Sequence, residues 1–266
     1  QNKGTYVLYN TGTMTFGGAA YSFASNEVRG IWNSGTMRFS NADGSVKFTD
    51  NKDGTGGAVY VVGGSVIFDG MAEFLRNTGS KGGAAYTADK GTLTFNGSAL
   101  FDGNTAQVGG AIYNLGTLNF NGSSYTFTNN TANGGNLNDI YNDGVMNVGV
   151  AGKTTGFNIS YISNRQTRNI TAQTNFFGTV NLKATNDNDL IDFKNRMVLK
   201  SGVTLNVLSD IVVTGYTKDM ASSEYGGGIS MGGGVFNALG NVTIKDNFVN
   251  GQGGGIDMTG GVMTLG

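Results

Sequence analysis

The sequence predicts an all-β protein: a right-handed parallel β-helix (β-solenoid) of about ten coils, with three short strands in each coil. Two observations predict this fold. A block of about 28 residues recurs along the chain, and each copy holds three short apolar runs separated by Gly, Asn or Asp. No useful stretch shows the 3.6-residue periodicity of a helix, so helices are expected to be nearly absent. Since one coil cannot bury its own apolar residues, the coils must stack into continuous ladders.

The first element of each repeat is a Gly-Gly pair followed by a small or apolar run. Its copies begin at Gly56, Gly82, Gly109, Gly227 and Gly254. Glycine tolerates the left-handed backbone of tight turns and allows a neighbouring chain to approach closely. We therefore expect these pairs to lie at corners of the coil.

The second element is a turn glycine followed by a short alternating run. It occurs at Gly12, Gly35, Gly64, Gly91, Gly116, Gly144, Gly178, Gly202, Gly234 and Gly261. The nine intervals between these glycines average about 28 residues. Five copies carry a phenylalanine at the same point, and these are predicted to form one core ladder: Phe16, Phe39, Phe68, Phe95 and Phe120.

The third element is Phe-x-x-Asn. Its copies are Phe23/Asn26, Phe48/Asn51, Phe74/Asn77, Phe101/Asn104 and Phe127/Asn130. The phenylalanines predict a second core ladder, in which each buried ring contributes about 1.5–3 kcal/mol. Asn51, Asn77, Asn104 and Asn130 are expected to be structural as well, since stacked asparagines can hydrogen-bond along the axis. Trp32 occupies a tyrosine-like slot of its repeat, and we expect it to be a core residue.

Residues 1–266 are expected to be a single β-helix segment of a longer protein, because neither end carries the polar cap that closes a solenoid. Residues 149–225 lose the Gly-Gly pair and hold much irregular charge, so they are predicted to form irregular coils with longer loops. Binding residues concentrate in loops. Loops within 149–177 and 184–197 are therefore the predicted binding regions.

Composition excludes several classes of function. The 17 Lys and Arg residues are balanced by 18 Asp and Glu residues, so no basic stripe for nucleic acid is expected. The chain has no Cys and no His, which removes the commonest zinc ligands and the Ser/His and Cys/His catalytic pairs. No apolar run is long enough to span a membrane as a helix. We expect no catalytic site and no cofactor.

The one candidate metal site is a weak calcium site at Asp187, Asp189 and Asp192. Alternate carboxylates can supply the oxygen ligands that Ca²⁺ prefers. The segment lacks the Gly and the closing Glu of a dedicated calcium loop, so a solvated loop is the favoured interpretation.

The alternation of Gly-Gly-Ala-φ, where φ is apolar, with Phe-x-x-Asn resembles the polymorphic outer-membrane proteins of chlamydiae and related autotransporter passengers. The residues that carry this resemblance are 56–59, 82–85 and 109–112, together with the five Phe-x-x-Asn copies. It covers residues 1–148 well and 226–266 in part. The resemblance implies a secreted or cell-surface passenger used in adhesion and anchored to the outer membrane through a region outside this chain.

The favoured function is therefore non-enzymatic adhesion to host cells or neighbouring surfaces, with a host or bacterial surface protein or glycan as partner. An alternative is a structural stalk, filament or matrix module that self-associates end to end or side by side. A remote alternative is a polysaccharide-active enzyme, because many parallel β-helices act on polysaccharides.

Overall fold

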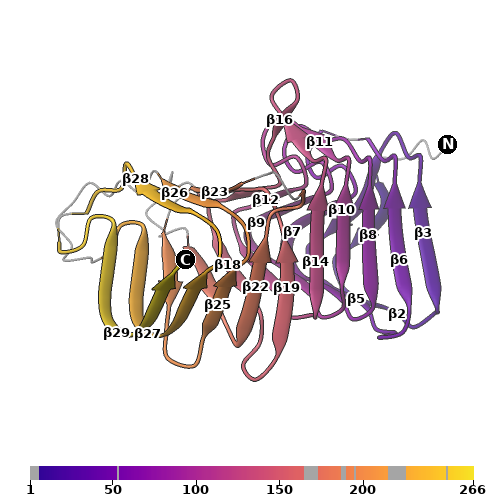
Figure 1. The fold of residues 1–266 in the computed structure, drawn as a ribbon. Helices are drawn as coiled ribbons and strands as arrows, with labels where there is room; N and C mark the ends of the chain where they lie inside the picture. Colours follow the sequence, from indigo (N-terminus) through magenta and orange to yellow (C-terminus); the bar gives the residue numbers. More distant parts are fainter. Residues whose placement is uncertain are drawn as a thin grey trace.

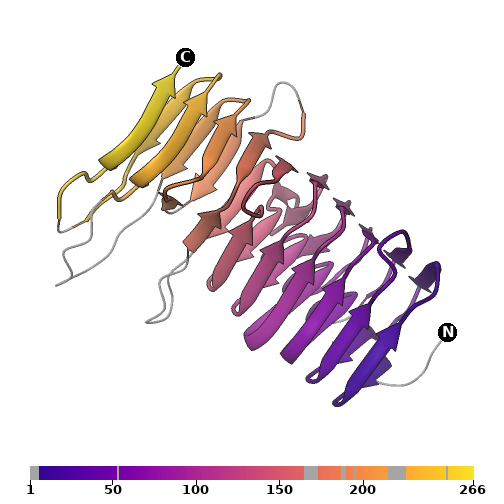
Figure 2. The ribbon, with the colours of Figure 1, turned by 90° about the horizontal axis from the view of Figure 1, so that it is seen from below.

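The computed structural model describes residues 6–52, 54–164, 173–186, 190–194, 196–214, 226–249 and 251–266. Every regular element in these ranges is a β-strand, and nearly all strand pairs are parallel. The predicted all-β solenoid is confirmed, with a number of turns close to the ten predicted. The coils stack into an elongated rod whose first and last strands lie at opposite ends (Figures 1 and 2). Within the described ranges, the structure contains no helix long and apolar enough to cross a membrane.

The strands form three faces, each a ladder of parallel neighbours. Face 1 contains, in order, β1 (Tyr6–Asn10), β4 (Arg29–Asn33), the first part of β7 (Val59–Phe68), the first part of β9 (Ala85–Phe95), β12 (Ile112–Asn114), β17 (Ile140–Asn142), β20 (Tyr161–Asn164), β23 (Ile191–Lys194), β26 (Ile211–Thr214) and β28 (Val242–Lys245). Face 2 contains β2 (Thr13–Phe16), β5 (Thr36–Phe39), the second parts of β7 and β9, β13 (Thr117–Phe120), β18 (Val145–Val148), β21 (Gln173–Phe176), β24 (Met197–Leu199) and the first parts of β27 (Ile229–Ala238) and β29 (Ile256–Leu265). Face 3 contains β3 (Ala20–Ala24), β6 (Ser45–Thr49), β8 (Met71–Leu75), β10 (Ala99–Asp102), β14 (Ser124–Thr128), β19 (Thr154–Asn158), β22 (Thr179–Lys183), β25 (Thr204–Val207) and the second parts of β27 and β29.

The core is built from stacked phenylalanine rings. On face 2 the ring of Phe39 stacks on those of Phe16 and Phe68, with centroids 4.7 and 5.0 Å apart. On face 3, Phe48 and Phe74 stack at 4.9 Å. These spacings follow the distance between adjacent strands of a sheet. Rings of the two faces meet edge to face, an arrangement that adds attraction beyond burial.

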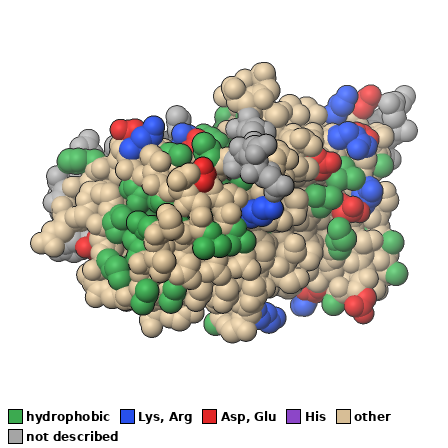
Figure 3. All heavy atoms as spheres, in the orientation of Figure 1, with side chains coloured by type: hydrophobic (Ala, Val, Ile, Leu, Met, Phe, Trp, Pro, Cys, Tyr) green, Lys and Arg blue, Asp and Glu red, His purple; other side chains and the backbone are tan. Residues whose placement is uncertain are grey.

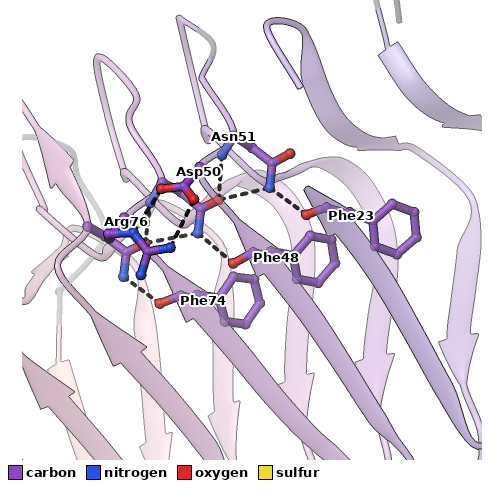
Figure 4. Close-up of polar contacts among 8 residues, drawn as sticks. Phe23, Phe48, Asp50, Asn51, Phe74 and Arg76 are labelled. Atoms are coloured by element: carbon purple, nitrogen blue, oxygen red, sulfur yellow. Dashed lines mark hydrogen bonds and ion pairs between the residues drawn. The ribbon is translucent and has the colours of Figure 1, made fainter. Parts of the chain in front are cut away.

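The Phe-x-x-Asn motif is a bend that directs an amide into the rod (Figure 4). The residue before the asparagine has a positive φ, 53° at both Asp50 and Arg76, which turns the chain out of face 3. The Nδ2 of Asn51 then donates to Oδ1 of Asn77 at 2.9 Å and to the carbonyl oxygen of Phe23 at 2.9 Å. The same pattern links Asn26, Asn51, Asn77, Asn104 and Asn130. These buried asparagines therefore form a continuous hydrogen-bonded chain along the axis, here called the asparagine ladder.

Steric constraints explain each residue of the Gly-Gly-Ala motif. Gly82 has a φ of +63°, in the left-handed region that favours glycine. A Cβ on Gly83 would overlap the carbonyl oxygen of Gly110 in the next coil, so this position admits no side chain. Ala84 is fully buried, where its methyl group fills the corner. The motif thus allows adjacent coils to meet at the entrance to face 1.

The repeat changes face in the middle of the rod. The strands that follow Gly116 and Gly144 lie on face 2, whereas those that follow Gly178 and Gly202 lie on face 3. Strand β19 takes the place on face 3 that Phe-x-x-Asn strands hold in earlier coils. Strand β20, in which Tyr161 and Asn164 have the spacing of that motif, lies on face 1 instead. One inserted strand therefore advances the repeat by one face, while the faces themselves remain continuous.

Candidate binding surface

The outer side of face 1 carries a row of aromatic residues at equivalent positions of consecutive strands. This aromatic row consists of Tyr9, Trp32, Tyr60, Tyr86, Tyr113 and Tyr141. Tyr9 is 56% exposed, and the row becomes more covered toward Tyr141, which is 7% exposed. The prediction that Trp32 is a core residue is wrong. Its neighbours Ile31 and Asn33 are buried and point inward, so alternation along the strand turns the half-buried Trp32 outward.

Most neighbouring rings of the row are in contact. Tyr9 stacks on Trp32 with centroids 4.5 Å apart. At the other end, Tyr113 stacks on Tyr86 at 5.2 Å and on Tyr141 at 4.5 Å. Burial raises the pKa of Tyr113, whose hydroxyl also forms a hydrogen bond with Tyr141. The raised pKa keeps the Tyr113 hydroxyl neutral at physiological pH.

A projecting hairpin stands beside the covered end of the row. It is formed by β15 (Thr131–Ala132) and β16 (Asn136–Leu137), which pair antiparallel and project at the top of Figure 1. Asn133 and Gly134 at its tip have positive φ values of 47° and 79°. In the preceding coils, β11 (Thr105–Ala106) and bridges such as Lys81–Val108 occupy this corner between faces 3 and 1. The hairpin therefore widens the corner locally.

Hairpin, corner and row enclose a pocket of about 270 Å³. Its lining consists of Lys81, Val108, Tyr113, Asn133, Asn138, Tyr141 and Tyr161. The ammonium group of Lys81 lies over the Tyr113 ring, 5.3 Å from its centroid. Asn138 Oδ1 is buried and accepts no hydrogen bond from any described residue. The lining residues that the structure describes thus combine aromatic rings, an aliphatic side chain, amides and one cation, and none of them is a carboxylate.

Asp139, the residue after Asn138, ends the asparagine ladder. Its Oδ1 accepts from Asn130 Nδ2 at 2.9 Å, and its Oδ2 accepts from the backbone N–H groups of Ser160 and Tyr161, both at 3.1 Å. A carboxylate suits this end because both oxygens accept, whereas asparagine has only one accepting oxygen. Burial raises the pKa of Asp139 to about 6, although the three hydrogen bonds act in the opposite direction.

Of the three candidate calcium ligands, only Asp192 lies among the described residues. Asp187 and Asp189 lie outside the described residues. Asp192 lies on β23, where its Oδ2 forms an ion pair with Lys194 at 3.1 Å. No group of three or more Asp and Glu side chains that could hold a metal ion occurs within the described part of the chain.

The two predicted binding loops extend partly beyond the described ranges. Residues 165–172 of the first and 187–189 and 195 of the second lie outside them. The described parts of 149–177 include β19, β20 and β21, which continue the three faces. The hairpin at 131–137 precedes both loops, and the sequence interpretation missed it. Its signal was Asn133-Gly134-Gly135, a glycine-rich turn that interrupts the repeat.

Charged side chains are few and mixed in sign. In the view of Figure 3, Lys and Arg side chains lie beside Asp and Glu side chains toward the N-terminal end, and apolar side chains gather over the C-terminal part. Arg76 makes a bidentate pair with Asp50, with both contacts at 2.9 Å. This pair joins two adjacent coils and lowers the pKa of Asp50.

Comparison with known proteins supports the resemblance stated above. A family model described as the Chlamydia polymorphic membrane protein repeat matches residues 98–115. The matched segment includes the Phe-x-x-Asn strand β10, the Gly-Gly-Ala motif and β12, so it contains both repeat motifs. No curated protein and no solved structure matches the chain.

Proposed function

We propose that this chain is a non-enzymatic passenger segment of a cell-surface or secreted protein, and that it attaches to host cells or neighbouring surfaces. The observation that carries the proposal is the aromatic row on face 1, which ends in a pocket beside a projecting hairpin. The match to a chlamydial membrane-protein repeat supports a place at the cell surface, with the anchor in a region outside this chain.

Inward and outward side chains of each coil have different roles, and this difference supports attachment over a function as a spacer. Inward positions are occupied by the phenylalanine ladders and the asparagine ladder, which hold the coils together. Outward positions on face 1 are aromatic in six successive coils, although a rod that served only as a spacer needs no such side chains there. Aromatic residues with a polar group are enriched at binding surfaces because they offer large contact area and a hydrogen-bonding tip.

A stalk or filament remains the competing function, and self-association would be its signature. The experiment couples the purified segment to beads and scores attachment to host-type cells, to bacteria and to beads that carry the same segment. Attachment to cells that excess soluble segment competes away is the expected result. Bead-to-bead binding without attachment to either cell type would instead identify a structural rod.

A matched pair of variants tests where attachment occurs. Replacing Tyr9, Trp32 and Tyr60 by Ser removes the exposed half of the aromatic row. The control replaces Thr13, Thr36 and Ser65 by Ala, at outward positions of face 2 in the same three coils. We expect the first variant to lose most cell attachment and the control to retain it. Equal attachment by both variants would show that the binding surface does not lie on face 1.

A further inference from the structure

We infer that the pocket at the covered end of the aromatic row binds one sugar residue of a surface glycan and prefers an acidic sugar. This inference rests on the proposed attachment function and adds the class of ligand and the residues that recognise it. The volume of the pocket, about 270 Å³, lies just below the usual range for small-molecule sites and suits a single sugar ring.

The aromatic row itself creates the space. Tyr86, Tyr113 and Tyr141 stack in successive coils, but the next strand in register carries Ser163 opposite Tyr141. The aromatic row therefore ends at Tyr141, and Tyr161 lines the pocket from the following strand. A sugar ring has an apolar C–H face and a rim of hydroxyl groups. Tyrosine matches both, because it offers an aromatic surface and a hydroxyl.

Asn138 provides the acceptor for a sugar hydroxyl. Its Oδ1 is buried and lacks a hydrogen bond from any residue that the structure describes, a state that is rare in folded proteins. The backbone around it is fixed, because its N–H donates to the Asn130 carbonyl oxygen at 3.1 Å and its own carbonyl oxygen accepts from Gly110 N–H at 2.6 Å. Because no hydrogen bond from the described residues holds Oδ1 in place, rotation of the side chain can turn this oxygen toward a hydroxyl group in the pocket.

Lys81 provides the preference for acidic sugars. Among the described residues that line the pocket, it is the only charged one. Its exposed ammonium group lies above the Tyr113 ring, so a carboxylate could pair with it at the open side. Charge-assisted hydrogen bonds are about twice as strong as neutral ones, which favours an acidic sugar over its neutral analogue.

The test measures binding of the whole segment to sialyllactose, to a glucuronate-containing oligosaccharide and to neutral lactose, by glycan array and then by calorimetry. We expect at least one acidic glycan to bind at least tenfold more tightly than lactose. Lys81→Gln should remove this preference, whereas the control Lys153→Gln, at an exposed turn outside the pocket lining, should keep it.

Asn138→Leu separates a binding role from a structural one. Removing an acceptor that has no hydrogen bond within the described part of the chain should not lower the melting temperature, yet it should weaken glycan binding at least tenfold. Glycan binding unchanged by both pocket variants would overturn the site. Attachment of the beads to cells without binding to any of these glycans would overturn the sugar assignment alone and leave the attachment function standing.

Discussion

Asn77 shows what a single member of the asparagine ladder contributes. Its Oδ1 accepts from the side chain and the backbone N–H of Asn51 at 2.9 and 3.0 Å, and its Nδ2 donates to Asn104 and to the Phe48 carbonyl oxygen. The residue is fully buried, so no water can replace these partners. One side chain therefore satisfies polar groups in both neighbouring coils.

Replacing Asn77 by Ala should lower the free energy of unfolding by about 3 kcal/mol, because a buried N–H and part of the ladder lose their partners and a small cavity opens. Asn121→Ala is the control, since Asn121 is half-buried and its side chain donates one exposed hydrogen bond to Asn96. Chemical denaturation of both variants gives the comparison. Equal losses would mean that the asparagine ladder does not stabilise the stack.

Asp139 gives the rod a pH dependence of known sign. Its pKa in the folded state is raised to about 6 from an ordinary value of 3.8, so the folded protein binds more protons than the unfolded chain between these values. Stability should therefore fall as pH rises from about 4 to about 6 and then level off, with an upper limit of about 3 kcal/mol for a shift of about two pH units.

The measurement for Asp139 is the free energy of unfolding between pH 4 and pH 7, for the wild type and for Asp139→Asn. Asparagine does not titrate, so the variant should lose this decline. The lowered pKa values of Asp50, Asp69 and Asp210 give a pH dependence of the opposite sign. Asp50 has a lowered pKa, so its contribution disappears only in more acidic solution. A decline of the same size in the variant would assign the effect to another group.

At the scale of the element, the Gly-Gly pair decides how closely coils approach. Gly83→Ala should destabilise the rod by about 2 kcal/mol or more, because the added methyl group meets the backbone of the next coil and the backbone has to shift. Gly12→Ala is the control, since its Cβ would have no atom within 4 Å. Thermal unfolding of the two variants should separate them clearly. Similar melting temperatures would contradict the steric explanation of the motif.

The change of face by the repeat is a second element-scale claim, and cysteine pairs test it. In the structure Asn147 lies opposite Asn175, and Asn175 Nδ2 donates to Asn147 Oδ1 at 2.9 Å. Asn181, which occupies the same place in its motif as Asn147, lies opposite Gly156 instead. The chain has no natural cysteine to compete.

Adjacent parallel strands are about 4.8 Å apart, within the reach of a disulfide. Asn147→Cys with Asn175→Cys should therefore form a disulfide under mild oxidation, while Asn147→Cys with Asn181→Cys should not. Mass spectrometry of the oxidised proteins distinguishes the two. A disulfide in the second pair only would place equal motifs on the same face and refute the inserted strand.

The limits of prediction from sequence are visible in these same elements. Coil spacing could be predicted because every stacked coil must return to the same axis after a similar chain length. The inserted strand could not be predicted, because equal motifs were expected to lie on the same face of the rod. The only sign of it in the sequence is the interval of 34 residues from Gly144 to Gly178, which is longer than the average of about 28. Trp32 was misplaced because its residue type suggested the core, although the alternation around Ile31 places it outside.

At the scale of the whole molecule, inward side chains hold the rod together and outward side chains are available for binding. Each coil contacts its neighbours through inward ladders, so outward positions can vary without loss of the fold. The pocket could not be predicted from the sequence. It depends on a hairpin at 131–137 and on tyrosines whose proximity arises only when coils several dozen residues apart are stacked.

The most direct test of the account is a cross-linking scan for the surface that contacts the cell. Because the chain is free of cysteine, single cysteines can carry a photo-activated cross-linker at Tyr60 and Asn133 within the proposed surface, at Thr92 on face 2 and at Thr126 on face 3. The account predicts high cross-linking yield to host-cell surfaces at Tyr60 and Asn133 and low yield at the other two positions. A highest yield at Thr92 or Thr126, or equal yields at all four, would contradict face 1 as the binding surface.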